Sequence, residues 1–261
     1  MKTEPEQKII RETIQVPPAS PVIDIQHLKI SFGAQEILKD ISLTLGRGEN
    51  LVVMGKSGSG KSVLIKCLVG LLKPDSGNIT ILEKDLIALQ RNELNELRQK
   101  IGFLFQSGAL YDSMTVKQNI EFPLRRIKKE LTEKQIAEKV NEVLENVDLV
   151  DSLNKMPSSL SGGMRKRISL ARTIVVDPLI MLYDEPTTGL DPVTSDEISA
   201  LILEVQKKYK TSSIIITHDI KCALHTANRI VMLREGLVFM EGKPEEFKQS
   251  TDEYIQSFSF Q

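Results

Sequence analysis

Two segments near the start of the chain alternate apolar and polar residues. Residues 22–32 (VIDIQHLKISF) alternate in this way, and residues 41–45 (ISLTL) repeat the pattern just before Gly46. Alternation of this kind is typical of half-buried antiparallel strands, which face the core on one side and solvent on the other. A turn at residues 74–77 (PDSG) precedes another predicted edge strand at 78–82. The pattern therefore predicts an antiparallel β lobe near the N-terminus.

Further segments contain continuous apolar runs and predict strands of a different kind. They are residues 50–54, 179–183, 212–217 and 229–236. Uninterrupted apolar runs of this length are typical of strands that are buried on both faces. Helices are predicted over 61–72, after the first run, and over 195–208, between the second run and the third. Strands that alternate with helices indicate an α/β fold with a mostly parallel core sheet, covered by helices on both sides.

The middle of the chain, residues 90–172, changes to helical spacing. Apolar residues recur there along one face, opposite Glu and Lys, as in an amphipathic helix. The clearest stripe consists of Ile136, Val140, Val143, Leu144 and Val147. We therefore expect one domain over residues 22–245 that contains a mostly helical lobe at about 90–172.

Both ends of the chain lack the pattern of a folded element. Residues 1–21 are charged and proline-rich, without the apolar stretch of a secretory signal, and are expected to form a flexible leader. Residues 246–261 are expected to form a C-terminal tail that is frayed at Phe258 and Phe260, with docking of these two side chains onto a partner chain as the alternative. No apolar run approaches the roughly 18 residues needed to cross a bilayer, so no membrane span is predicted.

Composition narrows the function classes. The 41% of hydrophobic residues and 26% of charged residues are those of an ordinary globular protein and exclude a disordered or collagen-like chain. Lys and Arg number 34 against 35 Asp and Glu, so the net charge gives no reason to expect a nucleic acid partner. Cys67 and Cys222 lie far apart in apolar stretches, which favours buried thiols in a reducing compartment over a disulfide or a metal site.

The sequence GKSGSGKS at residues 55–62 follows a predicted buried strand and precedes a predicted helix. It fits the phosphate-loop pattern GxxxxGK(S/T) in the context that this motif requires. Glycines allow successive backbone N–H groups to surround phosphate oxygens, and the following helix points its positive end at them. We expect Lys61 to contact the β- and γ-phosphates of a nucleotide and Ser62 to coordinate Mg²⁺.

Two adjacent carboxylates, Asp184 and Glu185, follow the apolar run 179–183, at a strand end where an open sheet places its ligand. We expect Asp184 to hold Mg²⁺ and Glu185 to polarise the attacking water, because one carboxylate could not fill both roles. Together with the phosphate loop, the pair predicts a P-loop ATPase or GTPase. No Asn/Lys-x-Asp element that would read guanine follows the pair, which favours ATP.

The segment LSGGMRK at residues 160–166 narrows the class further, because it resembles the signature loop of ATP-binding cassette (ABC) proteins. The resemblance continues through Gln106 after an apolar strand, through TGLDP at 188–192 and through His218, all in the family's order. It extends over nearly the whole chain, from about residue 22 to 242. It implies the ABC ATPase fold and hydrolysis of ATP, with ATP and Mg²⁺ bound.

The resemblance also implies roles for individual residues. Gln106 would couple Mg²⁺ and water to the helical lobe, His218 would sense the γ-phosphate, and Phe32 would stack on adenine, with an ordinary strand aromatic as the alternative. The implied catalytic residues are Glu185, His218 and Gln106. The implied Mg²⁺ ligands are Ser62, Gln106 and Asp184. The implied nucleotide contacts are Phe32, Gly55, Lys56, Ser57, Gly58, Ser59, Gly60, Lys61, Ser62, Val63, Ser161, Gly162, Gly163 and Asp191.

The same resemblance implies that the ATP site is shared between two copies of the chain. Ser161 and Gly163 would contact the γ-phosphate held by the other copy in a head-to-tail dimer, with Asp191 at the seam. A backbone-rich loop at a helix N-terminus is a good anion site, which fits this role. A monomer is then expected to hydrolyse ATP poorly.

Within the family, FQSGAL at 105–110 and Met164, where Gln is commoner, resemble the ATPase subunit of Mla-type bacterial transporters that work with MCE-domain proteins. This resemblance implies a peripheral motor at the cytoplasmic face of the bacterial inner membrane that moves phospholipids between the inner and outer membranes. The implied partners are an integral-membrane permease, an MCE-domain protein and a small regulatory subunit. Tyr111, Met114 and Phe122 are candidates for the groove that receives the permease, or equally for the core of the helical lobe. The alternatives are the ATPase of an amino-acid or ion importer and a soluble ABC ATPase that works without a permease.

Overall fold

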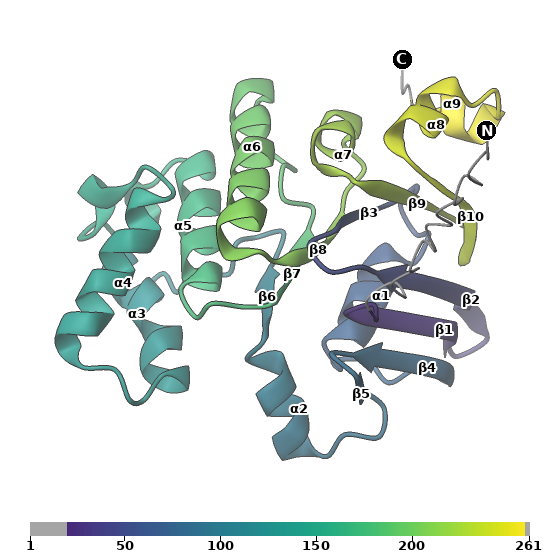
Figure 1. Cartoon of the computed structure of the whole chain (residues 1–261). Helices are drawn as coiled ribbons and strands as arrows, with labels where there is room; N and C mark the ends of the chain where they lie inside the picture. The colour runs from purple at the N-terminus through teal and green to yellow at the C-terminus, as the bar shows by residue number, and fades with distance from the viewer. Residues whose placement is uncertain (1–19, 259–261) are drawn as a thin grey trace, which may run out of the picture.

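The computed structural model describes residues 20–258 (Figure 1). Most of the expected leader at 1–21, and Phe260, lie outside the described residues. Within this range, ten strands form one sheet. From edge to edge they are β5 (Lys84–Asp85), β4 (Ser76–Ile81), β1 (Ile23–Phe32), β2 (Gln35–Leu45), β10 (Leu237–Gly242), β9 (Arg229–Arg234), β3 (Asn50–Met54), β8 (Ser212–Ile216), β7 (Ile180–Asp184) and β6 (Ile101–Leu104). No described helix has the length and apolar character needed to span a bilayer.

The N-terminal lobe of the sheet is antiparallel, as predicted. β1 pairs antiparallel with β2 on one side and with β4 on the other. β2 is longer than the predicted strand at 41–45, and β4 is not the edge that was expected, because the two-residue strand β5 pairs outside it. Leu82 and Glu83 connect β4 to β5 with positive φ angles of 48° and 66°, which suit a tight hairpin turn.

The predicted parallel core is confirmed. β6, β7, β8, β3 and β9 run parallel to one another, and every residue of β3 and β8 is buried. Because these strands are parallel, β3 and β7 end at the same edge of the sheet. This topology brings the loop after β3 close to Asp184 at the end of β7.

The sequence pattern missed β10, which joins the two parts of the sheet. β10 pairs antiparallel with β9 and parallel with β2. Its residues are exposed or half-buried in turn, so it lacks the apolar run that marked the core strands. Glu235 and Gly236, with φ angles of 52° and 80°, form the turn that leads into it.

Helices cover both faces of the parallel strands, as predicted. The covering helices are α1 (Lys61–Leu68), α6 (Pro192–Tyr209) and α7 (Ile220–Thr226). α1 contributes to the buried cluster that contains Leu51 and Val53 of β3, whereas α6 and α7 contribute to the cluster that contains Val52 and Met54. Figure 1 shows α1 on the opposite side of the sheet from α6 and α7. α1 ends earlier than predicted, ahead of Gly70, which has a φ of 66°.

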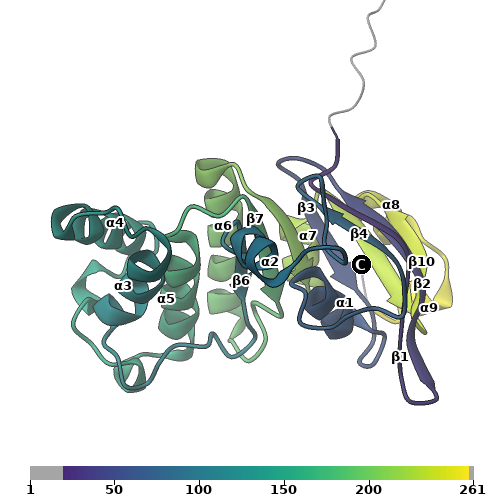
Figure 2. The same cartoon turned by 90° about the horizontal axis from the view of Figure 1, so that it is seen from below.

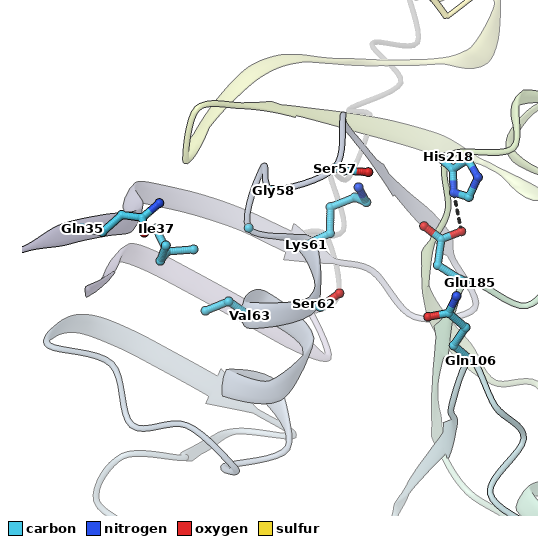
Figure 3. A pocket seen from close by; sticks show the side chains of 11 residues that line it. Gln35, Ile37, Ser57, Gly58, Lys61, Ser62, Val63, Gln106, Glu185 and His218 are labelled. Atoms are coloured by element: carbon cyan, nitrogen blue, oxygen red, sulfur yellow. Dashed lines mark hydrogen bonds and ion pairs between the residues drawn. The ribbon is translucent and has the colours of Figure 1, made fainter. Parts of the chain in front are cut away.

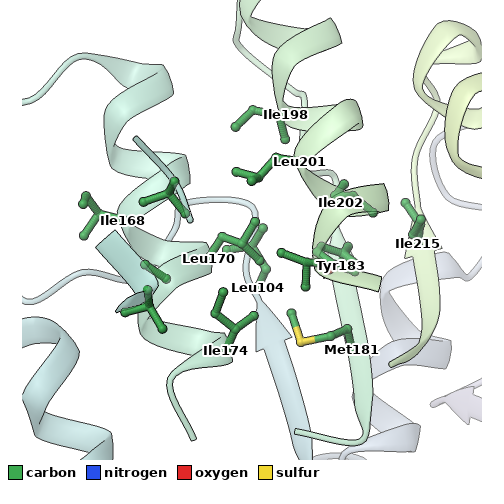
Figure 4. Close-up of a cluster of buried hydrophobic side chains, with 14 of the residues drawn as sticks. Leu104, Ile168, Leu170, Ile174, Met181, Tyr183, Ile198, Leu201, Ile202 and Ile215 are labelled. Carbon is green, nitrogen blue, oxygen red and sulfur yellow. The ribbon is translucent and has the colours of Figure 1, made fainter. Parts of the chain in front are cut away.

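The middle block forms a helical lobe, but it also supplies strand β6 to the sheet. Its elements besides β6 are α2 (Arg91–Arg98), α3 (Val116–Ile127), α4 (Glu133–Glu145), α5 (Gly162–Ile174) and the 3₁₀ turns η1 (Val150–Ser152) and η2 (Pro157–Ser159). All five residues of the predicted apolar stripe are buried. α5 attaches the lobe to the sheet, since Leu170 and Ile174 lie in one buried cluster with Leu104 of β6 and Met181 of β7 (Figure 4). Helices α3, α4 and α5 and the antiparallel lobe lie at opposite edges of the parallel part of the sheet (Figure 2).

The described part of the expected C-terminal tail is folded, not frayed. It contains α8 (Pro244–Gln249) and α9 (Glu253–Gln256). Phe247 and Ile255 are 1% and 2% exposed, respectively, within the same buried cluster as Met54. The ring of Phe258 packs edge-on against Tyr254 at 5.4 Å between ring centroids. These short helices are hard to recognise in a sequence, because each has only one or two buried side chains and so shows no repeating apolar pattern.

Candidate functional site

The loop between β3 and α1 takes a backbone path that requires glycine. Gly55 and Gly60 have φ angles of 154° and 102°. A Cβ atom on Gly60 would lie 2.4 Å from Leu38 Cδ2, and one on Gly55 would lie 2.6 Å from the Leu233 carbonyl oxygen. Neither the angles nor the space suit another residue. The glycines therefore set the curvature that the phosphate-loop motif predicts.

Lys61 is the first residue of α1, and its side chain is buried against this loop. Its residue exposure is 8%. Nζ donates hydrogen bonds to the carbonyl oxygens of Gly55 at 2.6 Å and Lys56 at 3.2 Å. Burial lowers the pKa of Lys61, while the charges of Glu185 and Asp184 act to raise it. The ammonium group is thus held beside the loop, with two carboxylates in electrostatic range.

Asp184 carries an unpaired acceptor at the end of β7. Its Oδ1 is buried and has no hydrogen-bond partner. Burial raises the pKa of Asp184, and the nearby charge of Glu185 raises it further, against the lowering effect of Lys66, Lys166 and Lys61. A buried, unpaired carboxylate oxygen fits a cation ligand.

The donor set around Asp184 suits Mg²⁺ better than a metal that needs an all-protein cage. The described residues contain no group of three or more His, Cys, Asp or Glu side chains that could hold a metal. Mg²⁺ is usually bound by one or two carboxylates together with phosphates and water. Ser62 and Gln106 line a pocket together with Glu185, the residue that follows Asp184, and add a hydroxyl and an amide oxygen. These residues fit the predicted Mg²⁺ site.

Glu185 is held in a fixed orientation next to Asp184. Its Oε2 accepts a hydrogen bond from Thr188 Oγ1 at 3.0 Å and lies 2.8 Å from His218 Nδ1 (Figure 3). Its backbone N–H donates to the Ile216 carbonyl oxygen at 2.8 Å. The side chain is 13% exposed, so the carboxylate is largely shielded while His218, at 62%, reaches toward solvent. The arrangement is that of an oriented general base.

One pocket of about 470 Å³ brings most of these groups together. Its walls come from the phosphate loop, from β2, and from the loops that follow β6, β7 and β8 (Figure 3). The lining residues are Gln35, Ile37, Ser57, Gly58, Gly60, Lys61, Ser62, Val63, Gln106, Glu185 and His218. All three predicted catalytic residues are therefore at one pocket, together with the phosphate loop.

The other predicted nucleotide contacts lie outside this pocket. Phe32 is half exposed at the end of β1. Within the phosphate loop, Gly55 and Ser59 are buried, and Lys56 Nζ lies 5.1 Å from the centre of the Tyr254 ring. The structure thus brings the loop residues 57, 58 and 60–63 to the pocket, but not Phe32.

The signature-loop residues also lie outside the pocket, in a second group. Ser161 caps α5 through a hydrogen bond from Met164 N to its Oγ at 3.2 Å. Asp191 caps α6 in the same way and also accepts from Thr194 Oγ1 at 2.6 Å. A Cβ on Gly163 would lie 2.5 Å from Thr194 Cγ2, so the two helix starts are closely packed. Ser161, Gly162 and Asp191 are exposed, which leaves this group open to a partner.

Sequence reasoning missed several residues that the fold places at the pocket. Gln35 and Ile37 line it from β2, and Thr188 holds Glu185. Lys166 donates to the carbonyl oxygens of Gln106 at 2.6 Å and Glu185 at 3.3 Å. No local sequence pattern predicts the contacts of Gln35, Ile37 and Lys166, because each contact joins segments that are distant in the sequence or depends on a side-chain rotamer. The TTG sequence after the acid pair was a usable signal for Thr188 alone.

Comparison with known proteins agrees with this geometry. The family model described as ABC transporter matches residues 38–188. The chain is 40% identical over 241 residues to the probable ribonucleotide transport ATP-binding protein mkl of Mycobacterium tuberculosis, covering 92% of this chain and 67% of that protein. It is 36% identical over 232 residues to the methionine import ATP-binding protein MetN of Brucella abortus, covering 88% and 62%, respectively. The chain thus spans about two thirds of the length of these relatives.

Solved structures show the same fold. The cbiO1 protein of Clostridium perfringens, part of the ABC transporter complex cbiONQ, superposes with a TM-score of 0.81 at 32% identity, over 87% of this chain and 90% of that one. A dimeric ATP-binding cassette in a post-hydrolysis state with ADP and phosphate gives 0.77 at 31% identity, over 85% and 98%. Phosphate loop, acid pair, pocket and fold all agree with these matches. The chain therefore belongs to the ABC transporter family and is an ATPase that binds ATP with Mg²⁺.

Proposed function

We propose that this chain is the motor subunit of a bacterial membrane transporter that moves phospholipids between the inner and outer membranes, together with an MCE-domain protein. The observation that carries the motor function is the single pocket that unites the phosphate loop with Gln106, Glu185 and His218. The lipid cargo rests on the Mla-type resemblance of residues 105–110 and Met164. The motor would bind a permease at the cytoplasmic face of the inner membrane.

In the proposed site, each residue has a role that its position supports. The phosphate loop and Lys61 bind the phosphates of ATP, and Ser62, Gln106 and Asp184 hold Mg²⁺. When bound, Mg²⁺ neutralises phosphate charge and orients the terminal phosphate. Glu185 accepts the proton of the attacking water, because Thr188 and His218 fix its carboxylate at the pocket.

Two copies of the chain would complete the site. Ser161, Gly162 and Gly163 lie away from the pocket of their own chain, and the first two are exposed at the start of α5. The N–H groups at a helix start attract phosphate oxygens. In a head-to-tail dimer this loop would reach the nucleotide of the other copy, with Asp191 beside it at the seam.

A groove in the helical lobe is the proposed permease contact. A second pocket, of about 200 Å³, lies between the end of β6, α3 and α5, and its lining includes Phe105, Pro123 and Arg172. Tyr111 is exposed next to it, with its ring 5.2 Å from Phe122 and 4.7 Å from the Arg172 guanidinium. The lining of this groove does not include Tyr111, Phe122 or Met114, and Met114 is half-buried. The groove therefore favours a docking role for Tyr111 over a place in the core.

A second candidate function is import of an amino acid or another small solute. It is favoured by the methionine importer subunit among the relatives, which covers 88% of this chain. Every nucleotide contact described above would be the same in such a transporter, because only the permease and the cargo differ. A soluble ABC ATPase without a permease remains a third outcome of the same test.

The test is recovery of the native complex. Tagged Glu185→Gln chain, which should bind ATP without turnover, is purified from its own membranes in mild detergent with ATP, and the proteins and lipids that copurify are identified. Lys61→Ala serves as the control, because two copies of this variant should not close around ATP. Copurification of a permease, an MCE-domain protein and phospholipid is the expected result. A solute-importer permease would overturn the lipid cargo, and soluble or ribosomal partners alone would overturn the transport function.

A further inference from the structure

Lys166 is a buried charged residue to which the ATP site described above gives no role. It lies in the second turn of α5, at the end of the signature-loop segment 160–166, and is 7% exposed. Burial lowers its pKa, while the charges of Asp184 and Glu185 act to raise it. Charged side chains are seldom buried to this extent unless they have specific partners. The partners of Lys166 therefore call for a functional explanation.

Both hydrogen-bond partners of Lys166 are backbone atoms of proposed catalytic residues. Nζ donates to the carbonyl oxygen of Gln106 at 2.6 Å and to that of Glu185 at 3.3 Å. These two residues follow different strands, β6 and β7, and their loops are separate segments of the pocket wall. One ammonium group thus ties together the two loops that should hold Mg²⁺ and the attacking water.

α5 also forms a hydrogen bond to the Gln106 loop at a second point. Arg172, almost two turns further along the helix, donates to the Ala109 carbonyl oxygen. Between the two contacts, Gly108 packs so closely on α5 that a Cβ atom there would lie 2.6 Å from Ser169 Oγ. The loop from Gln106 to Ala109 is therefore bound to the helix along its length, and a shift of α5 must carry Gln106 with it.

The same helix begins at the loop that is exposed toward a partner. Ser161 caps α5, and Lys166 lies five positions further along, which at 1.5 Å per residue is about 7.5 Å along the helix axis. A short helix segment is stiff on this scale. Any displacement imposed on the signature loop would reach the backbone of Gln106 and Glu185 through Lys166.

We propose that Lys166 is a positioning residue that links the signature loop of one copy to the catalytic residues of the same copy. The inference rests on the proposed two-copy site. When the signature loop engages the nucleotide of the partner, Lys166 fixes Gln106 and Glu185 in their working arrangement. Each copy thereby senses whether the site across the dimer is filled, and the two sites hydrolyse ATP cooperatively.

The test compares Lys166→Met with Lys166→Arg in the full-length chain. Methionine keeps the apolar stem but removes the ammonium, whereas arginine keeps a buried cationic donor. Lys139→Met is the matched control, because Lys139 donates to Asp177 at 2.8 Å in the same lobe, away from the pocket. The measurements are the dissociation constant for ATP, kcat, KM and the Hill coefficient for ATP hydrolysis, with thermal unfolding to check the fold.

In Lys166→Met, we expect kcat to fall roughly 10- to 100-fold, the range that misplacement of catalytic groups can cause. The dissociation constant for ATP should change less than about twofold, since the phosphate loop is untouched, and the Hill coefficient should fall toward about 1. Lys166→Arg should recover most of the turnover. If Lys166→Met does not fold, Lys166→Gln, which keeps a neutral donor, takes its place with the same expectations.

Three results would overturn the inference, and they differ in what else they overturn. If the wild type is cooperative and Lys166→Met keeps its kcat and Hill coefficient, the link through Lys166 is wrong while the two-copy site stands. If the wild type itself hydrolyses ATP with a Hill coefficient of 1, the coupling between the copies is contradicted, while the shared site is tested separately by mixing inactive Ser161→Arg and Lys61→Ala chains. A parallel loss of ATP affinity and turnover in Lys166→Met would also contradict a positioning role.

Discussion

Glu185 has a backbone conformation that few non-glycine residues adopt. Its φ is 50°, and the hydrogen bond from its N–H to Ile216 O at 2.8 Å holds the turn in place. Such a conformation persists only where the surroundings fix it, and it is found most often at functional sites. Here it directs the carboxylate toward Thr188 and His218 at the pocket. The strain is therefore consistent with a preorganised base.

The first prediction concerns this carboxylate. Glu185→Gln should retain ATP binding, because the side chain does not form the phosphate loop, but turnover should fall by about 10²- to 10⁴-fold, the usual contribution of a general base. Single-turnover hydrolysis and ATP binding measured on the same preparation check both parts. Glu197→Gln, which changes an exposed carboxylate paired with Arg167, is the control. Normal turnover in Glu185→Gln would remove Glu185 from the mechanism.

A second residue-scale prediction links stability to pH through Asp184. Burial and the charge of Glu185 raise its pKa in the folded state. The folded state then holds the proton more tightly than the unfolded state, so Asp184 makes folding less favourable as pH rises through its folded pKa. Asp184→Asn should therefore raise Tm of the nucleotide-free chain at neutral pH by roughly 2–4 °C, the shift expected for about 1 kcal/mol.

The pH dependence separates this effect from a general gain in packing. Because both states are protonated below the unfolded pKa, the difference in Tm between Asp184→Asn and the wild type should shrink as pH falls toward that value. Thermal unfolding at several pH values, without nucleotide, measures it. Asp196→Asn, on the exposed side of α6, is the control. An equal stabilisation at all pH values would contradict the charge as its cause.

At this scale the sequence predicted the residues whose identity alone carries the chemistry. The fixed spacing of the phosphate loop predicted Lys61, and the apolar run 179–183 predicted Asp184 and Glu185. The fold brings these three residues together. Lys166 and Gln35 could not be predicted, because their contacts join segments that only the folded sheet and α5 bring close. Adenine stacking by Phe32, which only the family resemblance implied, stays a prediction, because the ring is half exposed and lies outside the pocket lining.

Among the elements, the C-terminal helix α9 has an unexpected connection to the phosphate loop. Tyr254 Oη donates to the Leu233 carbonyl oxygen at 3.1 Å and accepts from the Lys56 N–H at 3.5 Å. The Tyr254 ring also lies 5.1 Å from Lys56 Nζ and 4.9 Å from the Arg234 guanidinium. α9 thus supports the loop at Lys56, a loop residue that does not line the pocket.

This support predicts an effect on ATP affinity. Tyr254→Ala removes the ring and both hydrogen bonds, so the loop should become more mobile and the dissociation constant for ATP should rise by roughly 3- to 10-fold, which corresponds to about 1 kcal/mol. The kcat at saturating ATP should stay within about twofold, since no catalytic group is touched. Equilibrium binding and steady-state kinetics give the two values. Tyr254→Phe, which keeps the ring between Lys56 and Arg234, should bind ATP nearly as well as the wild type, and equal affinity in Tyr254→Ala would show that the contact is incidental.

Elements were predictable where burial imposed a strong pattern. β3, β7 and β8 are buried on both faces and read as apolar runs, and the amphipathic stripe of α4 is equally clear. β10, α8 and α9 escaped prediction, because a half-exposed strand and two short helices bury few side chains each. Their place is decided by tertiary packing, such as the burial of Phe247 and Ile255 beside Met54.

At the scale of the whole molecule, the proposed dimer would have each chain contribute to two sites. The pocket opens at one end of the parallel strands, while the signature loop and Asp191 form a separate exposed group at the starts of α5 and α6. In a two-fold symmetric dimer, each such surface must meet its complement on the other copy, which produces two equivalent composite sites. A single chain offers both halves but cannot bring them together.

This arrangement predicts complementation between two inactive variants. Ser161→Arg should abolish turnover by blocking the signature loop, with only about 1 kcal/mol lost from the helix cap. Lys61→Ala should abolish it by removing the phosphate contact. In a mixed dimer, the phosphate loop of the Ser161→Arg chain faces the intact signature loop of the Lys61→Ala chain. Random pairing should then restore up to about a quarter of wild-type activity, because half of the dimers have one of two sites intact.

Mixing experiments with purified chains measure the recovery, and native mass spectrometry confirms that mixed dimers form. Ser158→Arg, which places an arginine at an exposed position just before the loop, should remain active alone. Mixed dimers without any activity would mean that each chain completes its own site.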